Sequence, residues 1–277
     1  IFKLVDETLG FALSKIILEG PESKLKLTQN TQPAIMTVGV SIFNVLKENS
    51  KFNLDKVNFF AGHSLGEYTA LVCSGSLTVE RAAYLLHERG KAMQEAVPAG
   101  EGSMLAVLGM NMDELEEEIN SLPKNEVCEI ANDNCDGQIV VSGQKKIVET
   151  LNENLKKKKK KGIILPVSAP FHCSLMKNAS INMKDKIETT NFLKPAPSII
   201  SNVTAKEESD INTIKKLLID QITSRVRWRE SVQYMINKGV TDFIEIGPGK
   251  VLCSLVKKIN KNVKLSNVNL IENIKND

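Results

Sequence analysis

Apolar residues recur at helical spacing in two long parts of this chain. Between residues 31 and 46 they stand three and four positions apart, which predicts a buried helix. A second such pattern predicts a long amphipathic helix over 78–97. Thr78 is a suitable N-cap for that helix, and Pro98 with Gly100 would end it.

A shorter pattern joins these two helices. Residues 57–61 form a β-prone run, the sequence FAGHSLGE follows at 60–67, and residues 67–73 predict a helix rich in Ala and Leu. Strand, sharp turn and helix is the context in which the serine of G-x-S-x-G acts as a nucleophile. The five-residue pattern also occurs by chance, so Ser64 alone could equally be a turn serine between two glycines.

The middle of the chain alternates short strand and helix patterns. Strands are predicted at 103–110, 127–131, 138–142 and 163–167, with helices at 113–122 and 145–160. The resulting order, β-α-β-β-α-β, is that of a ferredoxin-like unit. We expect it to form a small subdomain over 102–168, inserted into a larger body made of 1–101 and 169–277.

Strand and helix patterns resume after this insert. Strands are predicted at 198–203 and 242–246, with helices at 211–222 and 229–238, and the sequence Gly-Pro-Gly follows at 247–249. This alternation predicts an α/β fold with a mostly parallel sheet in the larger body.

Composition changes this picture little. The 277 residues are 42% hydrophobic, enough for a full core, and no apolar run is long enough to span a membrane. Five cysteines without a C-x-x-C pair argue against a disulfide framework and against a zinc site. The net charge of +3 depends on the six lysines at 156–161, which we interpret as a solvated helix end or loop. The alternative is a nucleic-acid or membrane patch, but no aromatic residues interleave with these lysines.

A nucleophilic serine needs a base within hydrogen-bond reach, and the chain has three histidines. His63 is next to Ser64, and adjacent side chains at a tight turn usually point apart. His87 lies inside the predicted helix 78–97 and is expected to be a surface or packing residue. His172 is therefore the candidate base by elimination, although taken alone it could be an ordinary loop histidine. The sharp turn around Ser64, a nucleophile elbow, would supply the Leu65 N–H as an oxyanion donor. No acidic residue is marked out by its local sequence as the partner of the histidine.

Arg89, in the long predicted helix over 78–97, has two interpretations. It could be an exposed helix cation that pairs with neighbouring acids. It could also be a guanidinium that grips a substrate carboxylate bidentately, which only a carboxylated acyl group would require.

Five stretches go further than periodicity. In chain order they are GHSLGEYTALVCSG, RGKAMQEAVP, NDNCDGQIVVSG, PVSAPFHCSLM and IGPGKVL. Together they closely resemble the malonyl-CoA:acyl carrier protein transacylases of type II fatty acid synthesis, and the resemblance extends from about residue 31 to 256. It implies a hydrolase-like α/β core with the ferredoxin-like insert and an active site between the two.

The resemblance also implies roles for particular residues. Ser64 would carry the malonyl group as an ester, His172 would act as base and then acid, and Arg89 would pair with the malonyl carboxylate. The backbone carbonyl of Gln221 would orient the histidine. Other positions would line the pocket or the cleft, with Phe171 selecting malonyl over branched groups: Met93, Phe171, Gln32 and Asn202.

The expected partners are malonyl-CoA and an acidic acyl carrier protein carrying phosphopantetheine, with no metal, no bound cofactor, no nucleic acid and no membrane. A monomer is expected. Arg225, Arg227 and Arg229, with the lysine run, are candidates for a basic docking face. Two rival hypotheses remain, a serine thioesterase or esterase that would not need Arg89, and an inactive scaffold that binds carrier protein.

Two features depart from the resemblance. The family begins with a strand and a G-Q-G-S-Q turn whose glutamine helps to form the oxyanion hole, and this sequence has no such turn. We therefore expect a truncated sequence with reduced activity. The lysine run is the second departure. The cellular address is not determined, with a lean to an organelle such as a plastid over a bacterial cytoplasm or a mitochondrion.

Overall fold

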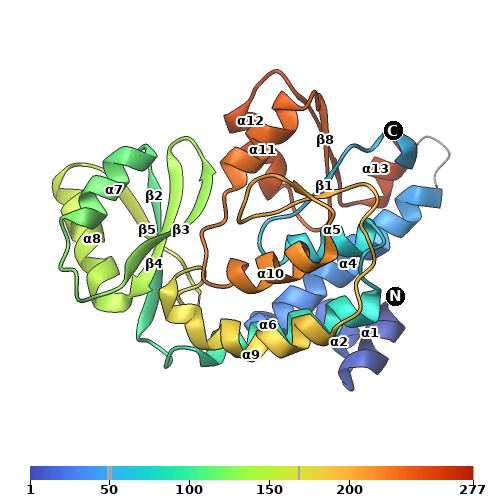
Figure 1. The fold of residues 1–277 in the computed structure, drawn as a ribbon, viewed down its shortest axis with the longest axis horizontal. Helices are drawn as coiled ribbons and strands as arrows, with labels where there is room; N and C mark the ends of the chain where they lie inside the picture. The colour runs from blue at the N-terminus through green and yellow to red at the C-terminus, as the bar shows by residue number, and fades with distance from the viewer. Residues whose placement is uncertain (49–51, 168, 277) are drawn as a thin grey trace.

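The computed structural model describes residues 1–48, 52–167 and 169–276 (Figure 1). The helices are α1 Phe2–Leu9, α2 Leu13–Glu19, α3 Glu22–Leu25, α4 Thr28–Glu48, α5 Gly66–Cys73, α6 Val79–Glu95, α7 Met112–Asn120, α8 Lys145–Lys157, α9 Lys177–Thr189, α10 Ile211–Gln221, α11 Trp228–Asn237, α12 Val251–Ile259 and α13 Ile271–Asn276. Short 3-10 helices cover Leu54–Lys56 and Ser174–Met176. The strands are β1 Phe60–Ala61, β2 Gly102–Leu108, β3 Cys128–Cys135, β4 Gln138–Gln144, β5 Lys161–Ile164, β6 Ile199–Ile200, β7 Glu207–Glu208, β8 Asp242–Ile246 and β9 Lys264–Val268.

The middle of the chain forms a four-stranded sheet with the order β3-β4-β2-β5, and every neighbouring pair is antiparallel. The elements follow the predicted sequence of strand, helix, strand, strand, helix and strand. Alternate residues of β2 point to opposite faces, so Leu105 and Val107 pack with α7 and α8 while Met104 faces the other way. In Figure 1 this sheet and its two helices occupy one end of the molecule, and both chain ends lie on the opposite side.

The strands of the larger body form two small sheets. β1 pairs with β6 in parallel and β6 with β7 in antiparallel fashion, while β8 and β9 form a separate parallel pair. The strand expected at 198–203 is shorter than predicted because the chain turns back at once, with Ser201 N–H bonded to Lys206 O at 3.0 Å. The strand expected at 57–61 is likewise reduced to its last two residues.

The lysine run at 156–161 covers the end of α8, a turn and the start of β5. Helix α8 ends at Lys157, three residues earlier than expected, because Lys159 has a left-handed φ of 58°. Lys160 N–H then bonds back to Leu155 O at 2.9 Å, as in a helix-ending Schellman motif. β5 begins at Lys161 and ends at Ile164, so the strand prediction for 163–167 was wrong beyond Ile164.

Two large apolar clusters hold the body together. One is built mainly by α4, α5, α6, α9 and α10, and the other lies under α11 and α12. Phe171 packs against the first of these clusters and also against the inner face of the four-stranded sheet. No helix in the described residues is long and apolar enough to cross a membrane, and the five cysteines are unpaired.

Candidate active site

Ser64 stands on a sharp turn between β1 and α5. Its φ of 53° is left-handed, a conformation that costs energy for a residue with a side chain. The turn is tight, since a Cβ on Gly62 would lie only 2.0 Å from the carbonyl group of Gly66. The Ser64 N–H donates to Asn202 Oδ1 at 2.6 Å, and Asn202 Nδ2 donates to Gly62 O at 2.8 Å. One buried amide side chain thus clamps both sides of the turn.

His172 faces this turn from the segment after β5. Its Nε2 lies 2.8 Å from Ser64 Oγ, and its Nδ1 lies 2.9 Å from the backbone oxygen of Gln221. A carbonyl oxygen can only accept, so Nδ1 carries the proton and Nε2 is free to accept one from the serine. Burial, and next the charge of Arg89, lower the pKa of His172 to about 3. The imidazole is therefore neutral near pH 7.

The other two histidines serve different contacts. His63 Nε2 lies 2.9 Å from Asn134 Oδ1 in the four-stranded sheet. His87 Nδ1 donates to Gln29 O at 3.0 Å. That carbonyl lacks its helical donor because residue 33, four positions later in α4, is a proline. His87 is thus a packing residue that satisfies a helix carbonyl.

Arg89 projects from α6 into the same site and is almost fully buried, with 1% of its surface exposed. One terminal nitrogen donates to Gln32 Oε1 at 2.6 Å, and the other to Ser64 Oγ at 3.0 Å and Gln221 Oε1 at 2.8 Å. All three acceptors are neutral, its Nε has no partner, and it forms no ion pair among the described residues. A buried cation usually has an anionic partner, so this guanidinium is suited to an anion that binds from outside.

Close contact between α4 and α6 brings Arg89 to Gln32. A Cβ on Gly90 would lie 2.5 Å from Gln29 Cα and 2.6 Å from Thr28 O, so only glycine allows this approach. Met93, one turn further along α6, is buried, with its sulfur 3.9 Å from Gln32 Nε2.

Leu65 and Phe171, the remaining predicted site residues, are half-buried. Leu65 caps the start of α5, and its N–H makes no hydrogen bond within the described part of the chain. Backbone donors at a helix start are the groups that an oxyanion can use. Phe171 directly precedes His172, and its ring fills the space between the two halves of the molecule.

Glu67 is a member of the site that sequence reasoning missed. Its carboxylate is 1% exposed, and Oε2 accepts from Gln221 Nε2 at 2.8 Å and from the Asn202 N–H at 3.0 Å. Burial raises the pKa of this carboxyl to about 7, although its hydrogen bonds and Arg89 oppose the shift. The available signal was its position as the sole charged residue in the apolar helix α5.

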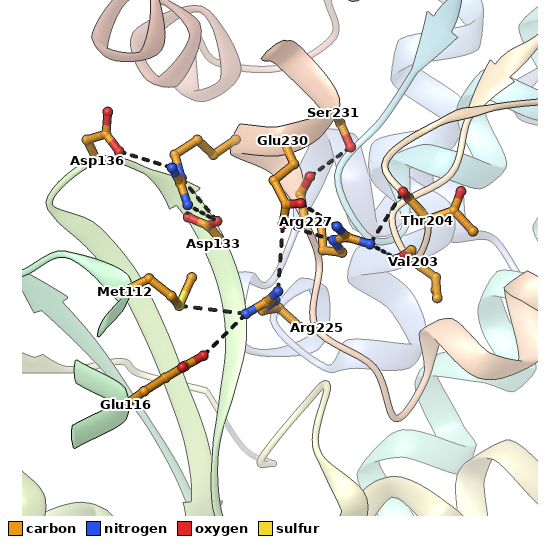
Figure 2. A network of polar contacts seen from close by, with 11 residues as sticks. Met112, Glu116, Asp133, Asp136, Val203, Thr204, Arg225, Arg227, Glu230 and Ser231 are labelled. Carbon is orange, nitrogen blue, oxygen red and sulfur yellow. Dashed lines mark hydrogen bonds and ion pairs between the residues drawn. The ribbon is translucent and has the colours of Figure 1, made fainter. Parts of the chain in front are cut away.

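The arginines at 225, 227 and 229, expected to form a basic docking face, are occupied within the chain (Figure 2). Arg225 pairs with Glu116 of α7 and with Glu230, and Arg227 pairs with Glu230. Arg229 grips buried Asp133 of β3 through two nitrogens and also pairs with Asp136. Two of the three arginines thus join α11 and the segment before it to the four-stranded sheet and its helix α7.

Within residues 1–48, 52–167 and 169–276, no group of three or more His, Cys, Asp and Glu side chains is arranged to hold a metal ion. The side chains that meet at Ser64 Oγ are not a metal-binding set. A neutral imidazole and a guanidinium meet the same hydroxyl oxygen, at 2.8 and 3.0 Å. This arrangement can deprotonate the serine and bind an anion beside it.

Comparison with known proteins gives consistent results. The family model of the acyl transferase domain matches residues 3–277. A malonyl CoA-acyl carrier protein transacylase of Bacillus subtilis is 44% identical over 266 residues, covering 95% of this chain and 83% of that protein. The crystal structure of an acyl-carrier-protein-S-malonyltransferase from Bartonella henselae has a TM-score of 0.95 at 44% identity, covering 99% of this chain and 88% of that one. A malonyl-transacylase solved in complex with its type II PKS acyl-carrier protein has a TM-score of 0.95 at 34% identity, covering 100% and 90%.

Proposed function

This chain belongs to the acyl transferase family, and from that premise we propose that it moves a malonyl group from malonyl-CoA to the phosphopantetheine thiol of an acyl carrier protein, as in type II fatty acid synthesis. The observation that carries the proposal is the meeting of a serine, a neutral histidine and an unpaired buried arginine at one oxygen atom. A hydrolase of simple esters would not need the arginine, whereas a malonyl group brings the carboxylate that it lacks.

In the first half-reaction, His172 Nε2 takes the Ser64 proton and Oγ attacks the thioester carbonyl. The Leu65 N–H donates to the oxyanion, and Gln221 O keeps the proton of the imidazolium on Nδ1. As the C–S bond breaks, His172 returns the proton to the departing CoA sulfur. The products are a malonyl ester on Ser64 and free CoA, and no proton is gained or lost.

The second half-reaction reverses these roles. The carrier-protein thiol gives its proton to His172 and attacks the ester carbonyl, and Ser64 leaves with that proton. Arg89 would hold the malonyl carboxylate in both halves, while Met93, Phe171 and Gln32 would line the pocket. Neither half needs a metal or a bound cofactor in this proposal.

The architecture of the proposal follows the same family. We assign 102–168 as a ferredoxin-like small subdomain and 1–101 with 169–277 as a hydrolase-like large one; Ser168 and Asp277 lie outside the described residues. The observed support for the small subdomain is its antiparallel order β3-β4-β2-β5 with two helices on one face. The serine and the arginine come from the large subdomain, and His172 follows the junction.

We propose a monomer that docks an acidic carrier protein through lysines, because the three arginines are already paired. Lys156, Lys157, Lys159 and Lys161 are exposed and form no ion pair among the described residues. Charge reversal at these lysines should make the transfer rate at low salt depend less strongly on the concentration of carrier protein. An unchanged dependence would remove them from the docking face.

The decisive test of the function is intact-protein mass after brief mixing with malonyl-CoA. We expect one malonyl mass on the parent protein, none on Ser64→Ala, and much less on Arg89→Ala. The adduct should disappear when carrier protein with its phosphopantetheine is added. Rapid hydrolysis that survives Arg89→Ala would instead favour a thioesterase, and no adduct at all would favour a binding scaffold.

A further inference from the structure

The site contains a second buried ionisable group that the proposed mechanism does not use. Glu67 lies three residues after the serine, and its carboxylate contacts the two residues that position the reacting pair. Asn202 holds the Ser64 N–H, and Gln221 holds His172 Nδ1 through its backbone oxygen. Neither Glu67 contact involves the reacting atoms themselves, so its role is to position other residues.

A glutamine amide links Glu67 to Arg89. Gln221 Nε2 donates to Glu67 Oε2 at 2.8 Å, while its Oε1 accepts from Arg89 at 2.8 Å. This polarity fixes the amide orientation, because the anion requires the NH₂ group and the cation requires the oxygen. Glu67 thus balances the charge of Arg89 through this amide without contacting it, so the guanidinium has no direct ion pair within the described residues and can still bind a substrate carboxylate.

A malonyl carboxylate changes the charge balance of this site. With Glu67 ionised, the free site holds one cation and one anion, both about 1% exposed. A bound malonyl group would add a second anion beside the same guanidinium, leaving one buried negative charge without compensation. Such a charge is costly in a buried site, and a carboxylate in that position takes up a proton instead.

We propose that Glu67 is the positioning and charge-balancing residue of this site: ionised, it holds Gln221 and Asn202 in the free enzyme, and it takes one proton from solvent when a malonyl carboxylate binds Arg89. The inference rests on the proposed malonyl transfer. The neutral carboxyl keeps an oxygen that accepts from both partners, so positioning survives protonation.

The other charged groups around Glu67 define the alternatives. Burial is the main cause of the raised pKa of Glu67; Arg89 of α6 opposes the shift and Glu208 of β7 adds to it, while Tyr68 lies beside Glu67 on α5. The rival proton acceptor is His172, whose pKa is lowered by burial and next by the charge of Arg89. Neutralising Arg89 would raise the pKa of His172, so an experiment must separate the two groups.

Measuring proton uptake during ester formation distinguishes Glu67 from His172 as the proton acceptor. Enzyme and malonyl-CoA are mixed without carrier protein in weak buffer containing a pH indicator, and esters are counted by intact mass. The chemistry itself is proton-neutral at pH 7, because the released CoA thiol stays mostly protonated. Because the pKa of Glu67 is about 7, this carboxyl is ionised in about half of the free enzyme at pH 7 and in almost none at pH 5.5. Only the ionised form can take up its one proton, so we expect about half a proton per ester at pH 7 and almost none at pH 5.5.

Two variants and a second substrate complete the test. Glu67→Gln should form the ester without proton uptake, and Glu117→Gln, at an exposed position in α7, should behave as wild type. Any acetyl ester formed from acetyl-CoA should carry no uptake, because it brings no carboxylate.

Malonyl ester without uptake at pH 7 would overturn the inference while leaving the proposed function intact. Uptake that persists in Glu67→Gln would also overturn it and would assign the proton to His172. Should Glu67→Gln fail to fold, the inference is still tested by the wild-type protein, through its proton uptake per ester at pH 7 and 5.5 and through the acetyl-CoA control. Absence of any ester would reject the proposed function itself, and the inference with it.

Discussion

The two glycines that flank Ser64 provide a matched pair of substitutions. A methyl group at Gly62 would lie 2.0 Å from the carbonyl carbon and oxygen of Gly66 and 2.7 Å from Glu67 N. A methyl group at Gly66 would meet nothing within 4 Å. Neither glycine has a positive φ, so alanine fits the backbone conformation at both. The two substitutions therefore add the same group and differ only in the space around it.

The size of the effect follows from these distances. Carbon atoms in contact normally lie about 3.5 to 4 Å apart, so Gly62→Ala must displace backbone by about 1.5 Å. Overpacking costs about 1 to 3 kcal/mol when side chains can yield, and here the obstacle is backbone, so we expect a loss of about 3 kcal/mol or more. A displacement of 1 Å at reacting groups costs about 100-fold in rate, and we expect ester formation to slow by at least that factor. Gly66→Ala should instead keep its rate and gain up to about 1 kcal/mol, because alanine loses less entropy in a helix.

Urea unfolding measures the stability of both variants, and the rate of malonyl ester formation measures the geometry of the turn. The midpoint should fall for Gly62→Ala and stay level or rise for Gly66→Ala, with the same slope in both. A Gly62→Ala protein that unfolds at the wild-type midpoint and forms ester at the wild-type rate would refute the reasoning. Equal losses of stability and rate in both variants would show that any added methyl group disturbs the turn, and that the close approach of Gly62 to the Gly66 carbonyl is not the cause.

Three further predictions test other parts of the molecule. Arg229→Ala should lower the free energy of unfolding by about 3 kcal/mol because it leaves Asp133, 1% exposed, without its cation, whereas Lys264→Ala, which breaks a surface ion pair, should cost under about 1 kcal/mol; equal losses in urea would contradict this. Asn202→Ala leaves the half-buried Ser64 N–H and the buried Gly62 carbonyl unpaired, so the free energy of unfolding should fall by about 2 to 4 kcal/mol and ester formation should slow; a variant as stable and fast as wild type would exclude the clamp. Because the pKa of His172 is lowered to about 3, the rate of ester formation should change less than about twofold between pH 4.5 and 5.5; a tenfold loss toward pH 4.5 would indicate a base with the ordinary pKa of about 6.5.

Local patterns predicted most of the regular structure of the middle and end of the chain. The element order of the four-stranded unit matches, as do helices α10 and α11 to within one residue at each end. Helix α4 begins three residues before the predicted start. Strand β9 and helix α9 were missed. Short strands were the least predictable, because β1, β6 and β7 are two residues long and exist only through their pairing with one another.

For the candidate active site too, some features were predicted from the sequence and others were visible only in the structure. Sequence reasoning reached Ser64, His172 and Arg89 from a motif, an elimination and a resemblance, and the structure brings their side chains to one oxygen atom. The three arginines that are candidates for a basic docking face each form ion pairs within the chain (Figure 2). Nothing in the local sequence shows that carboxylates from α7 and β3 will meet them, because those partners are remote in the chain.

The sequence by itself determined the elbow, since two glycines, a serine and an apolar helix are local features whose backbone preferences act over a few residues. It also determined which residue types were available for the chemistry. Only the tertiary structure decided how they are used: Gln221 lies 157 positions from Ser64, yet its amide links the Ser64 carbonyl, Glu67 and Arg89. Charge balance and pKa values in a buried site depend on which groups share it, and that is fixed by packing between distant segments and not by local pattern.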